Sequence, residues 1–325
     1  MAPLLEVRDL HVDYRSPSGS LISALAGINV SVGAGEVLGV VGESGSGKSS
    51  FAASLLRLLP ANGQIRRGSI CLEGTDILRA NLGELEKIRG ARISMVFQEP
   101  GLALHPSMRI RDQVSEVLRA HDSLRTRERE QKEDKVLASV FPSDAARISS
   151  SYAHQLSGGQ RQRAVIALAI ACGPALLVAD EPTAALDPTT QRAILDLFAR
   201  LRRELGLTLI LITHNPALLA GLADRILVLY AGRVAELGPA RAVLSAPQHP
   251  YTQALMACMP LIRESELPVG KALLPVIAGE SPASLAPGCR FEPRCAERME
   301  MCTAREPAIT VLGDAHSVSC FKYGG

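Results

Sequence analysis

The sequence predicts an α/β fold with a mainly parallel core sheet, an antiparallel β-subdomain, an inserted helical subdomain and a small cysteine-rich C-terminal tail. Apolar runs at residues 38–41, 175–179 and 209–213 are too short for most helices and are typical of strands buried on both faces. Residues 99–172 have mostly helical patterns and no strong strand, which indicates an insertion. The sheet therefore begins before the helical subdomain and resumes after it.

A glycine-rich loop, Gly-Glu-Ser-Gly-Ser-Gly-Lys-Ser at residues 42–49, connects the first of these strands to a helical pattern over residues 49–59. In this context the glycines let backbone N–H groups wrap nucleotide phosphates, and the helix N-terminus adds its positive dipole end. Lys48 neutralises phosphate charge, and the Ser49 hydroxyl ligates Mg²⁺. The alternative is a Gly/Ser-rich turn that binds nothing. The expected nucleotide contacts are Gly42, Ser44, Gly45, Gly47, Lys48, Ser49 and Ser50.

Two adjacent carboxylates, Asp180 and Glu181, follow the strand at 175–179. At the carboxyl end of a strand beside a phosphate loop, such a pair divides into a Mg²⁺ partner and a group that orients or deprotonates the attacking water. We assign Asp180 to the metal and Glu181 to the water. The alternative is an acidic N-cap for the helix near Pro188, a position that Asp187 can fill instead.

A second anion-binding signal is Leu-Ser-Gly-Gly-Gln at residues 156–160, which opens a helical pattern that runs to Ala171. The N–H groups and dipole of such a helix attract an anion, although no lysine accompanies them. One phosphate cradle suffices for one ATP, so a second anion site suggests two chains clamped head to tail. The alternative is an ordinary glycine-containing helix start.

The ordered set of a phosphate loop, Leu-Ser-Gly-Gly-Gln and Asp-Glu resembles the ATP-binding subunits of ABC transporters, over residues 4–258. The resemblance implies a P-loop NTPase fold of the ABC ATPase type, which binds ATP and Mg²⁺ and hydrolyses ATP. It also implies a head-to-tail pair in which the Leu-Ser-Gly-Gly-Gln segment of each chain, residues 156–160, called the signature loop below, acts on the nucleotide of the other chain. The residues assigned to nucleotide binding outside the phosphate loop on this basis are Ser157, Gly158, Gly159, Gln160 and Asp187.

The same resemblance assigns roles to three catalytic side chains. Glu181 activates the water, and His214 becomes a γ-phosphate sensor that holds the water and Glu181 in line. Gln98 reaches Mg²⁺ and the lytic water while leading into the helical subdomain. Gln98, Ser49 and Asp180 together form the expected Mg²⁺ ligands. From its residue type alone, His214 is more often structural, although it follows a strand at the edge where open parallel sheets bind ligands.

Tyr14 follows a strand-like segment at residues 4–12, in a stretch rich in Ser, Pro and Gly. The family carries an aromatic ring here that stacks on adenine, so the resemblance makes Tyr14 an adenine contact. The alternative is a half-buried strand tyrosine. Stacking is favoured because an aromatic ring in such a loop has little core to join.

The composition agrees with an intracellular enzyme, in which any attachment to a membrane must come from partner subunits. The chain has 325 residues, 47% of them hydrophobic, which can form a full α/β core and a smaller unit. Its 35 Lys and Arg against 33 Asp and Glu leave no polybasic field for nucleic acid. A charge at Glu6 interrupts any signal peptide, and the most apolar stretch, 164–179, is too short for a membrane span. The family resemblance implies in addition that the subunit is peripheral, at the cytoplasmic face of the inner membrane, through permease subunits.

The predicted C-terminal tail, residues 259–325, is Pro-rich and contains four of the seven cysteines, with five, six and seventeen residues between them. Clustering in a core-poor segment indicates a cross-linked or metal-stapled unit. Disulfides are disfavoured in a reducing cytosol. Zinc sites usually pair cysteines at closer spacing, so the spacing alone does not choose between zinc, another metal centre and free thiols. The four residues are Cys289, Cys295, Cys302 and Cys320.

The pattern Gly-Cys-x-Phe-x-Pro-Arg-Cys at 288–295 and His-Ser-Val-Ser-Cys at 316–320 resemble the tail of oligopeptide, dipeptide and nickel importer ATPases. The resemblance implies a [4Fe–4S] cluster on the four cysteines, with zinc or free thiols as alternatives. It also implies an ATPase subunit, with its ABC domain at 1–258, that energises uptake of peptides or of nickel and metal chelates.

The implied partners are a homologous ATPase subunit in a homo- or heterodimer, two transmembrane permease subunits and an extracellular or periplasmic substrate-binding protein. One alternative is a soluble ABC ATPase outside transport, which predicts a coiled-coil insertion or a tandem duplicate that the sequence lacks. Another is a structural subunit that binds ATP beside an active sister.

Overall fold

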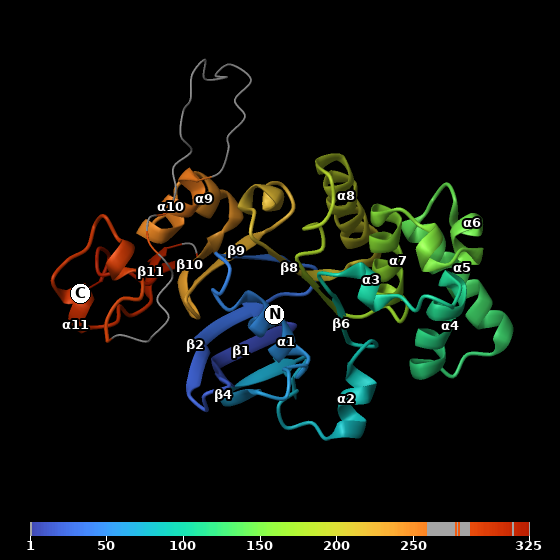
Figure 1. The fold of residues 1–325 in the computed structure, drawn as a ribbon, viewed down its shortest axis with the longest axis horizontal. Coiled ribbons are helices and arrows are strands. Elements are labelled where there is room, and N and C mark those ends of the chain that lie inside the picture. Colours follow the sequence, from blue (N-terminus) through green and yellow to red (C-terminus); the bar gives the residue numbers. More distant parts are fainter. Residues whose placement is uncertain (1, 259–276, 278, 280–286, 314, 325) are drawn as a thin grey trace, which may run out of the picture.

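A computed structural model of the chain describes residues 2–258, 277, 279, 287–313 and 315–324. The remaining residues of the predicted tail lie outside this description. Figure 1 shows an elongated molecule with a helical part at one end and the C-terminal tail at the other. Two sheets lie between these ends, and none of the described helices is long and apolar enough to cross a membrane.

The core of the molecule is an eight-stranded sheet. Its strands, in spatial order, are β11 (Thr310–Gly313), β12 (His316–Val318), β10 (Arg233–Pro239), β9 (Arg225–Tyr230), β3 (Val37–Val41), β8 (Thr208–Thr213), β7 (Leu176–Asp180) and β6 (Ile93–Val96). The strands from β9 to β6 run parallel, and β10, β12 and β11 are antiparallel. All residues of β3, β7 and β8 are buried. The predicted mainly parallel core is therefore confirmed.

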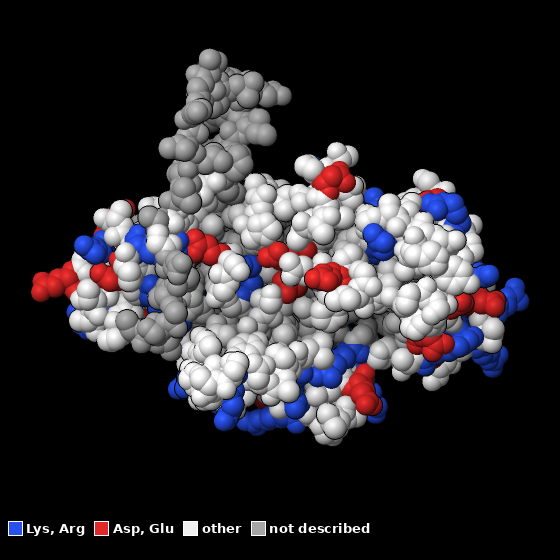
Figure 2. Space-filling model, viewed as in Figure 1, with Lys and Arg blue, Asp and Glu red and all other residues white. Residues whose placement is uncertain are grey.

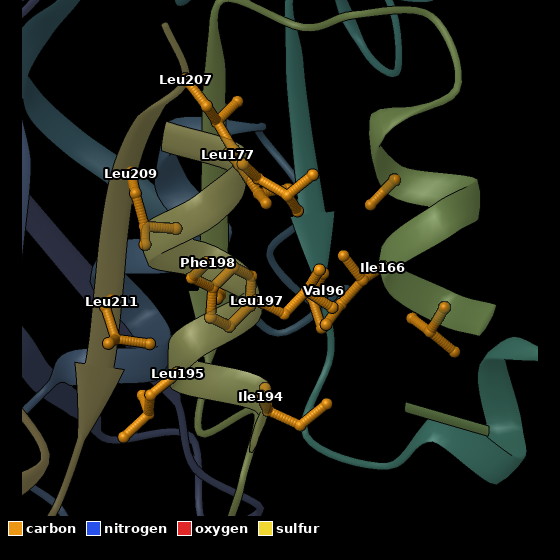
Figure 3. Close-up of a cluster of buried hydrophobic side chains, with 14 of the residues drawn as sticks. Val96, Ile166, Leu177, Ile194, Leu195, Leu197, Phe198, Leu207, Leu209 and Leu211 are labelled. Carbon is orange, nitrogen blue, oxygen red and sulfur yellow. The ribbon is translucent and has the colours of Figure 1, made fainter. Parts of the chain in front are cut away.

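The two faces of this sheet pack into separate hydrophobic clusters, which explains why its strands are continuously apolar. On one face Leu177 and Leu209 pack with Phe198, and Figure 3 shows Phe198 at the centre of the labelled side chains. On the other face Val178 and Ile210 join a second cluster. The helices and 3₁₀ turns outside the helical part and the tail are α1 (Lys48–Leu55), α2 (Leu82–Ile88), α8 (Pro188–Leu205), η2 (Pro216–Leu219), α9 (Ala240–Ser245) and α10 (Pro250–Ala257).

A second, four-stranded sheet is antiparallel, as predicted. Its strands, in spatial order, are β2 (Leu21–Val32), β1 (Leu5–Arg15), β4 (Gly63–Leu72) and β5 (Thr75–Asp76). The expectation that Tyr14 lies in a loop is wrong, because β1 extends to Arg15 and Tyr14 pairs with Ile22 on one side and Gly63 on the other. A side chain at Gly63 would lie 2.7 Å from the tyrosine ring, so this glycine makes room for it.

The part of the chain between β6 and β7 is helical and lies at one end of the molecule in Figure 1. Its elements are α3 (Pro100–Ala103), α4 (Ile110–His121), α5 (Thr126–Val140), α6 (Ala145–Ser150), the 3₁₀ turn η1 (Ala153–Gln155) and α7 (Gly158–Ile170). Helix α4 buries Ile110, Val114 and Leu118, four residues apart, on one face. Helix α7 packs on β6 and connects this part to the core sheet.

The described part of the tail is bonded to the core sheet. It contains the 3₁₀ turn η3 (Glu292–Arg294) and α11 (Met301–Ala304), and its strand β12 pairs with β10. The fully buried carboxylate of Glu236 in β10 accepts hydrogen bonds from the N–H groups of Gln248 and His249, and His316 Nε2 lies 2.7 Å away. These contacts satisfy a buried charge and attach the tail strand.

Candidate nucleotide-binding site

A cavity of about 870 Å³ lies where β3, β6, β7 and β8 reach their carboxyl ends. It is the position at which open parallel sheets bind ligands. The cavity is lined by Tyr14, Ser20, Leu21, Ile22, Ser23, Ala24, Ser44, Gly45, Gly47, Lys48, Ser49, Ser50, Gln98, Glu181, His214, Ala231 and Arg290. The structure thus brings the predicted phosphate loop together with all three predicted catalytic residues.

The phosphate loop has the backbone that its glycines allow. Gly47 precedes α1 with φ 102°, and a Cβ atom there would lie 2.6 Å from the carbonyl oxygen of Ala24. A Cβ atom at Gly42 would collide with the backbone of β9. Lys48 Nζ donates hydrogen bonds to the carbonyl oxygens of Gly42 at 2.8 Å and Glu43 at 2.9 Å. The side chain of Lys48 therefore reaches back across the phosphate loop to its first two residues.

The ammonium group of Lys48 is surrounded by acidic side chains. Burial lowers the pKa of its ammonium group, while the nearby carboxylates of Glu181, Asp180 and Glu43 raise it. A buried ammonium facing the cavity can accept a phosphate as a further anionic partner.

Asp180 has the surroundings of a cation ligand. Its side chain is buried, and burial raises the pKa of the carboxyl group while a hydrogen bond with the Ser49 side chain lowers it. Its Oδ1 atom is buried and makes no hydrogen bond to another residue. An unpartnered carboxylate oxygen beside a hydroxyl fits a hard cation such as Mg²⁺.

Glu181 and His214 form a pair at the cavity wall. His214 Nδ1 lies 3.1 Å from Glu181 Oε2, and both residues line the cavity together with Gln98. Tyr14 also lines the cavity, and its hydroxyl donates to Ser50 Oγ at 3.1 Å. The ring thus lies beside the start of α1, where a base can contact it.

The signature loop does not line this cavity. Ser157 caps α7, accepting a hydrogen bond from the N–H of Gln160 at 3.3 Å, and Gln160 Oε1 accepts one from the N–H of Ser157. Asp187 caps α8 by accepting from the N–H of Thr190 at 3.0 Å. A Cβ atom at Gly159 would lie 2.5 Å from Thr190, so the two helix starts are neighbours. Ser157, Gly158, Gly159, Gln160 and Asp187 therefore form a second surface, apart from Lys48 of the same chain.

The four tail cysteines converge but do not form a recognisable metal site. Burial raises the pKa of Cys289 to about 11 and also raises the pKa values of Cys295 and Cys320, and each of these thiols is influenced by Cys302. Among the described residues, no three His, Cys, Asp or Glu side chains have the spacing of a metal centre. The donor set suits a cluster, whereas this spacing does not.

Sequence reasoning missed Arg290, Ala231 and residues 20–24 as parts of the cavity wall. These segments lie far along the chain from the phosphate loop or inside an unremarkable strand, so no local pattern marks them. A local signal existed for a different residue outside the cavity wall: Glu43 places an acid inside an anion-binding loop, which requires a cationic partner, and in the structure that partner is Arg294.

A phosphate loop, a buried aspartate, a Glu–His pair and a separate signature loop define an ATPase of the ABC type. The ABC transporter family profile matches residues 25–184, and the profile of the oligopeptide/dipeptide transporter C-terminal region matches residues 235–302. The chain belongs to the ATP-binding proteins of ABC transporters, in their oligopeptide/dipeptide branch.

Curated relatives match almost the whole chain. It is 43% identical over 321 residues to the oligopeptide transport ATP-binding protein OppD of Escherichia coli, covering 98% of this chain and 93% of that protein. It is 40% identical over 323 residues to OppD of Haemophilus influenzae, covering 99% of this chain and 98% of that protein.

Solved structures share the fold of the ATPase part. A dimeric ATP-binding cassette in a post-hydrolysis state, bound to ADP and Pi, matches with a TM-score of 0.64 and 29% identity over 73% of this chain and 99% of that one. The cbiO1 protein of Clostridium perfringens, part of an ABC transporter complex, matches with a TM-score of 0.66 and 28% identity over 76% of this chain and 92% of that one. The predicted ABC ATPase fold is confirmed.

Proposed function

We propose that this chain is the ATP-binding and ATP-hydrolysing subunit of an ABC importer that energises the uptake of peptides. The observation that carries the proposal is the single cavity that joins Lys48 to Gln98, Glu181 and His214. The relatives named as oligopeptide transport proteins favour peptides over nickel and metal chelates, the other cargo that the sequence allowed.

In this proposal each side chain has one task in the transfer of the γ-phosphoryl group to water. Lys48 binds the phosphates, and Glu181 takes a proton as the water oxygen bonds to phosphorus and the bond to the β-phosphate oxygen breaks. His214, 3.1 Å from Glu181, orients that carboxylate. Gln98 contacts the reacting end of the nucleotide and precedes α3, so it links hydrolysis to the helical part.

Mg²⁺ fits the same site. Asp180, with its unpartnered buried Oδ1, and Ser49 and Gln98 are the residues that would hold it. When bound, the ion neutralises charge on the phosphate oxygens.

We extend the proposal to a head-to-tail pair of ATPase subunits. Support comes from Ser157 and its neighbours, which present a helix N-terminus outside the cavity of their own chain. In a pair, that helix start would meet the phosphates bound by the partner's Lys48 loop.

The proposed partners in the membrane are two permease subunits, with a substrate-binding protein outside, and the ATPase lies at the cytoplasmic face of the inner membrane. An apolar contact for such a partner is offered by Phe97 and Leu102, which lie before and after Gln98 and are 46% and 84% exposed.

On the face shown in Figure 2, basic and acidic side chains are interspersed, which does not favour nucleic acid as a partner. Intact Lys48, Glu181 and His214 also argue against an inactive structural subunit.

For the tail, we propose that Cys289, Cys295, Cys302 and Cys320 hold a [4Fe–4S] cluster. Four cysteine side chains support this proposal, because cysteine sulfur is the ligand of such clusters and these thiols lie close enough to act on one another's pKa values. Because their spacing in the described residues is not that of a metal site, binding requires the thiols to draw together.

The function is tested by replacing Glu181 with Gln, which keeps size and hydrogen bonding but removes the charge that activates water. ATP turnover is expected to fall by roughly 10²- to 10⁴-fold while ATP binding persists. Phosphate release and ATP binding are measured on the same preparation. Glu204→Gln, near the end of α8, is the matched control and retains turnover. Near-normal hydrolysis by Glu181→Gln would remove Glu181 from the catalytic role.

A further inference from the structure

An arginine of the C-terminal tail reaches the phosphate loop. Arg294 Nη1 lies 2.7 Å from Glu43 Oε2, and Arg294 Nη2 lies 3.0 Å from Glu43 Oε1. The Arg294 side chain is only 5% exposed. A bidentate pair of this kind is both stronger and more directional than a single contact. It connects two segments that are 251 residues apart in the sequence.

Glu43 needs such a partner because it lies in a loop built to bind anions. Its carbonyl oxygen accepts a hydrogen bond from Lys48, and its carboxylate acts on the pKa of the Lys48 ammonium group. An unpaired carboxylate here would repel bound phosphates and compete with them for Lys48. The guanidinium of Arg294 neutralises this charge without occupying the cavity, whose wall does not include it.

Residues of the tail and of core strand β9 together hold Arg294 in place. Arg294 donates to the carbonyl oxygen of Ile277 at 3.1 Å and to the Tyr230 hydroxyl at 3.3 Å, and it lies 5.8 Å from the centroid of the Tyr230 ring. Phe291, one turn earlier and 3% exposed, packs against the rings of Tyr230 and Tyr251 at 5.2 and 5.4 Å. The guanidinium group of Arg294 therefore faces Glu43 of the phosphate loop in a fixed orientation.

The backbone of Glu43 is fixed by the same neighbourhood. Its N–H donates to the hydroxyl of Tyr251, in α10, at 2.8 Å. Tyr251 in turn packs on Phe291 of the tail. Both the main chain and the side chain of Glu43 are thus held by residues near or within the C-terminal tail.

We propose that Arg294 is a positioning residue for ATP: it neutralises and fixes Glu43, so that the phosphate loop binds the nucleotide more tightly with this arginine of the tail in place. The inference rests on the proposed ATP binding and deepens it. It makes the tail, which also carries Cys295 directly after Arg294, a determinant of nucleotide affinity.

The proposal predicts an energetic coupling between the two side chains, which a double-mutant cycle measures in the full-length protein. The dissociation constant for ATP is determined for wild type, Arg294→Gln, Glu43→Gln and the double variant. Arg294→Gln is expected to weaken ATP binding by roughly tenfold when Glu43 is present, and by less than about twofold when residue 43 is Gln. The reason is that the glutamine leaves no charge to neutralise.

Two further variants separate this role from general stability. Arg298→Gln removes a tail arginine that lies 3.9 Å from Glu292 and does not contact the loop, and it is expected to bind ATP as wild type does. Arg294→Lys keeps the charge but loses the fork, so its affinity should fall between wild type and Arg294→Gln. This variant also serves if Arg294→Gln does not fold, as judged by thermal unfolding.

The outcomes distinguish this inference from the proposed function. Equal weakening by Arg294→Gln in both backgrounds would overturn it, because the arginine would then act through packing and not through Glu43. Unchanged affinity in folded Arg294→Gln or Arg294→Lys would overturn it as well. If the wild-type chain itself does not bind ATP, the proposed function fails instead.

Discussion

Glu181 has a backbone conformation that few residues other than glycine adopt, with φ 46°, directly after β7. Its N–H donates to the carbonyl oxygen of Ile212 at 3.0 Å, so the pairing with β8 holds the residue in this conformation. Left-handed backbone of this kind concentrates at functional sites, where surrounding structure imposes it. The same geometry directs the carboxylate toward His214, a relation that adjacency to Asp180 in the sequence does not contain.

At the residue scale, Lys48 gives a second test of the site. Lys48→Ala removes the cation that offsets Glu43, Asp180 and Glu181, so ATP binding is expected to weaken by roughly 10- to 100-fold. Equilibrium dialysis with ATP measures the effect. The exposed Lys87, in the last turn of α2, is the matched control, and Lys87→Ala should bind as wild type. Equal affinity of Lys48→Ala and wild type would contradict the phosphate-loop assignment.

At the element scale, the starts of α7 and α8 form one surface. Gly159 lies against Thr190, and Ser157 and Asp187 cap the two helices side by side. A helix start offers N–H groups and a partial positive charge to an anion. Because this surface does not line the cavity of its own chain, its anion is expected to come from a second chain.

Mixing two inactive variants tests that arrangement. Ser157→Arg combined with Lys48→Ala leaves, in a head-to-tail heterodimer, one site with both lesions and one with neither. Partial ATP hydrolysis should return in the mixture. The control pairs Lys48→Ala with the double variant Lys48→Ala/Ser157→Arg, which leaves no intact site and should stay inactive. A mixture as inactive as its parents, with heterodimers shown to form, would refute the trans arrangement or the independence of its two sites.

At the scale of the whole molecule, the tail continues the core. Strand β12 of the tail pairs with β10, and His316 in β12 contacts Glu236 in β10. Arg294 of the tail reaches Glu43 in the phosphate loop. The predicted boundary at residue 258 therefore separates segments of sequence that remain in contact in space. A change in the tail has a physical route to the nucleotide.

The cysteine proposal is tested at this scale by metal content. Protein purified without oxygen should be brown and contain about four irons per chain, as four-cysteine ligation of a [4Fe–4S] cluster requires. Cys295→Ser should lose the colour, whereas Cys71→Ser, in β4, should keep it. Colourless wild-type protein with stoichiometric zinc would replace the cluster by a structural zinc site and leave the ATPase proposal untouched.

The sequence by itself determined the buried strands of the core sheet and the motifs. Strands such as Leu209–Thr213 were predictable because burial on both faces makes a strand continuously apolar, and the phosphate loop because its glycines and lysine are adjacent in the chain. Each of these signals lies within a short stretch of sequence, so it can be recognised without knowing which distant residues pack against it.

Only the tertiary structure decided which distant segments meet. The chain alone placed Tyr14 in a loop, but pairing with Ile22 and Gly63 from two other strands makes it part of β1. It likewise gave no indication that Arg294 contacts Glu43. Periodicity and turn chemistry act over a few residues, whereas strand pairing and ion pairs across the molecule depend on how all elements pack together.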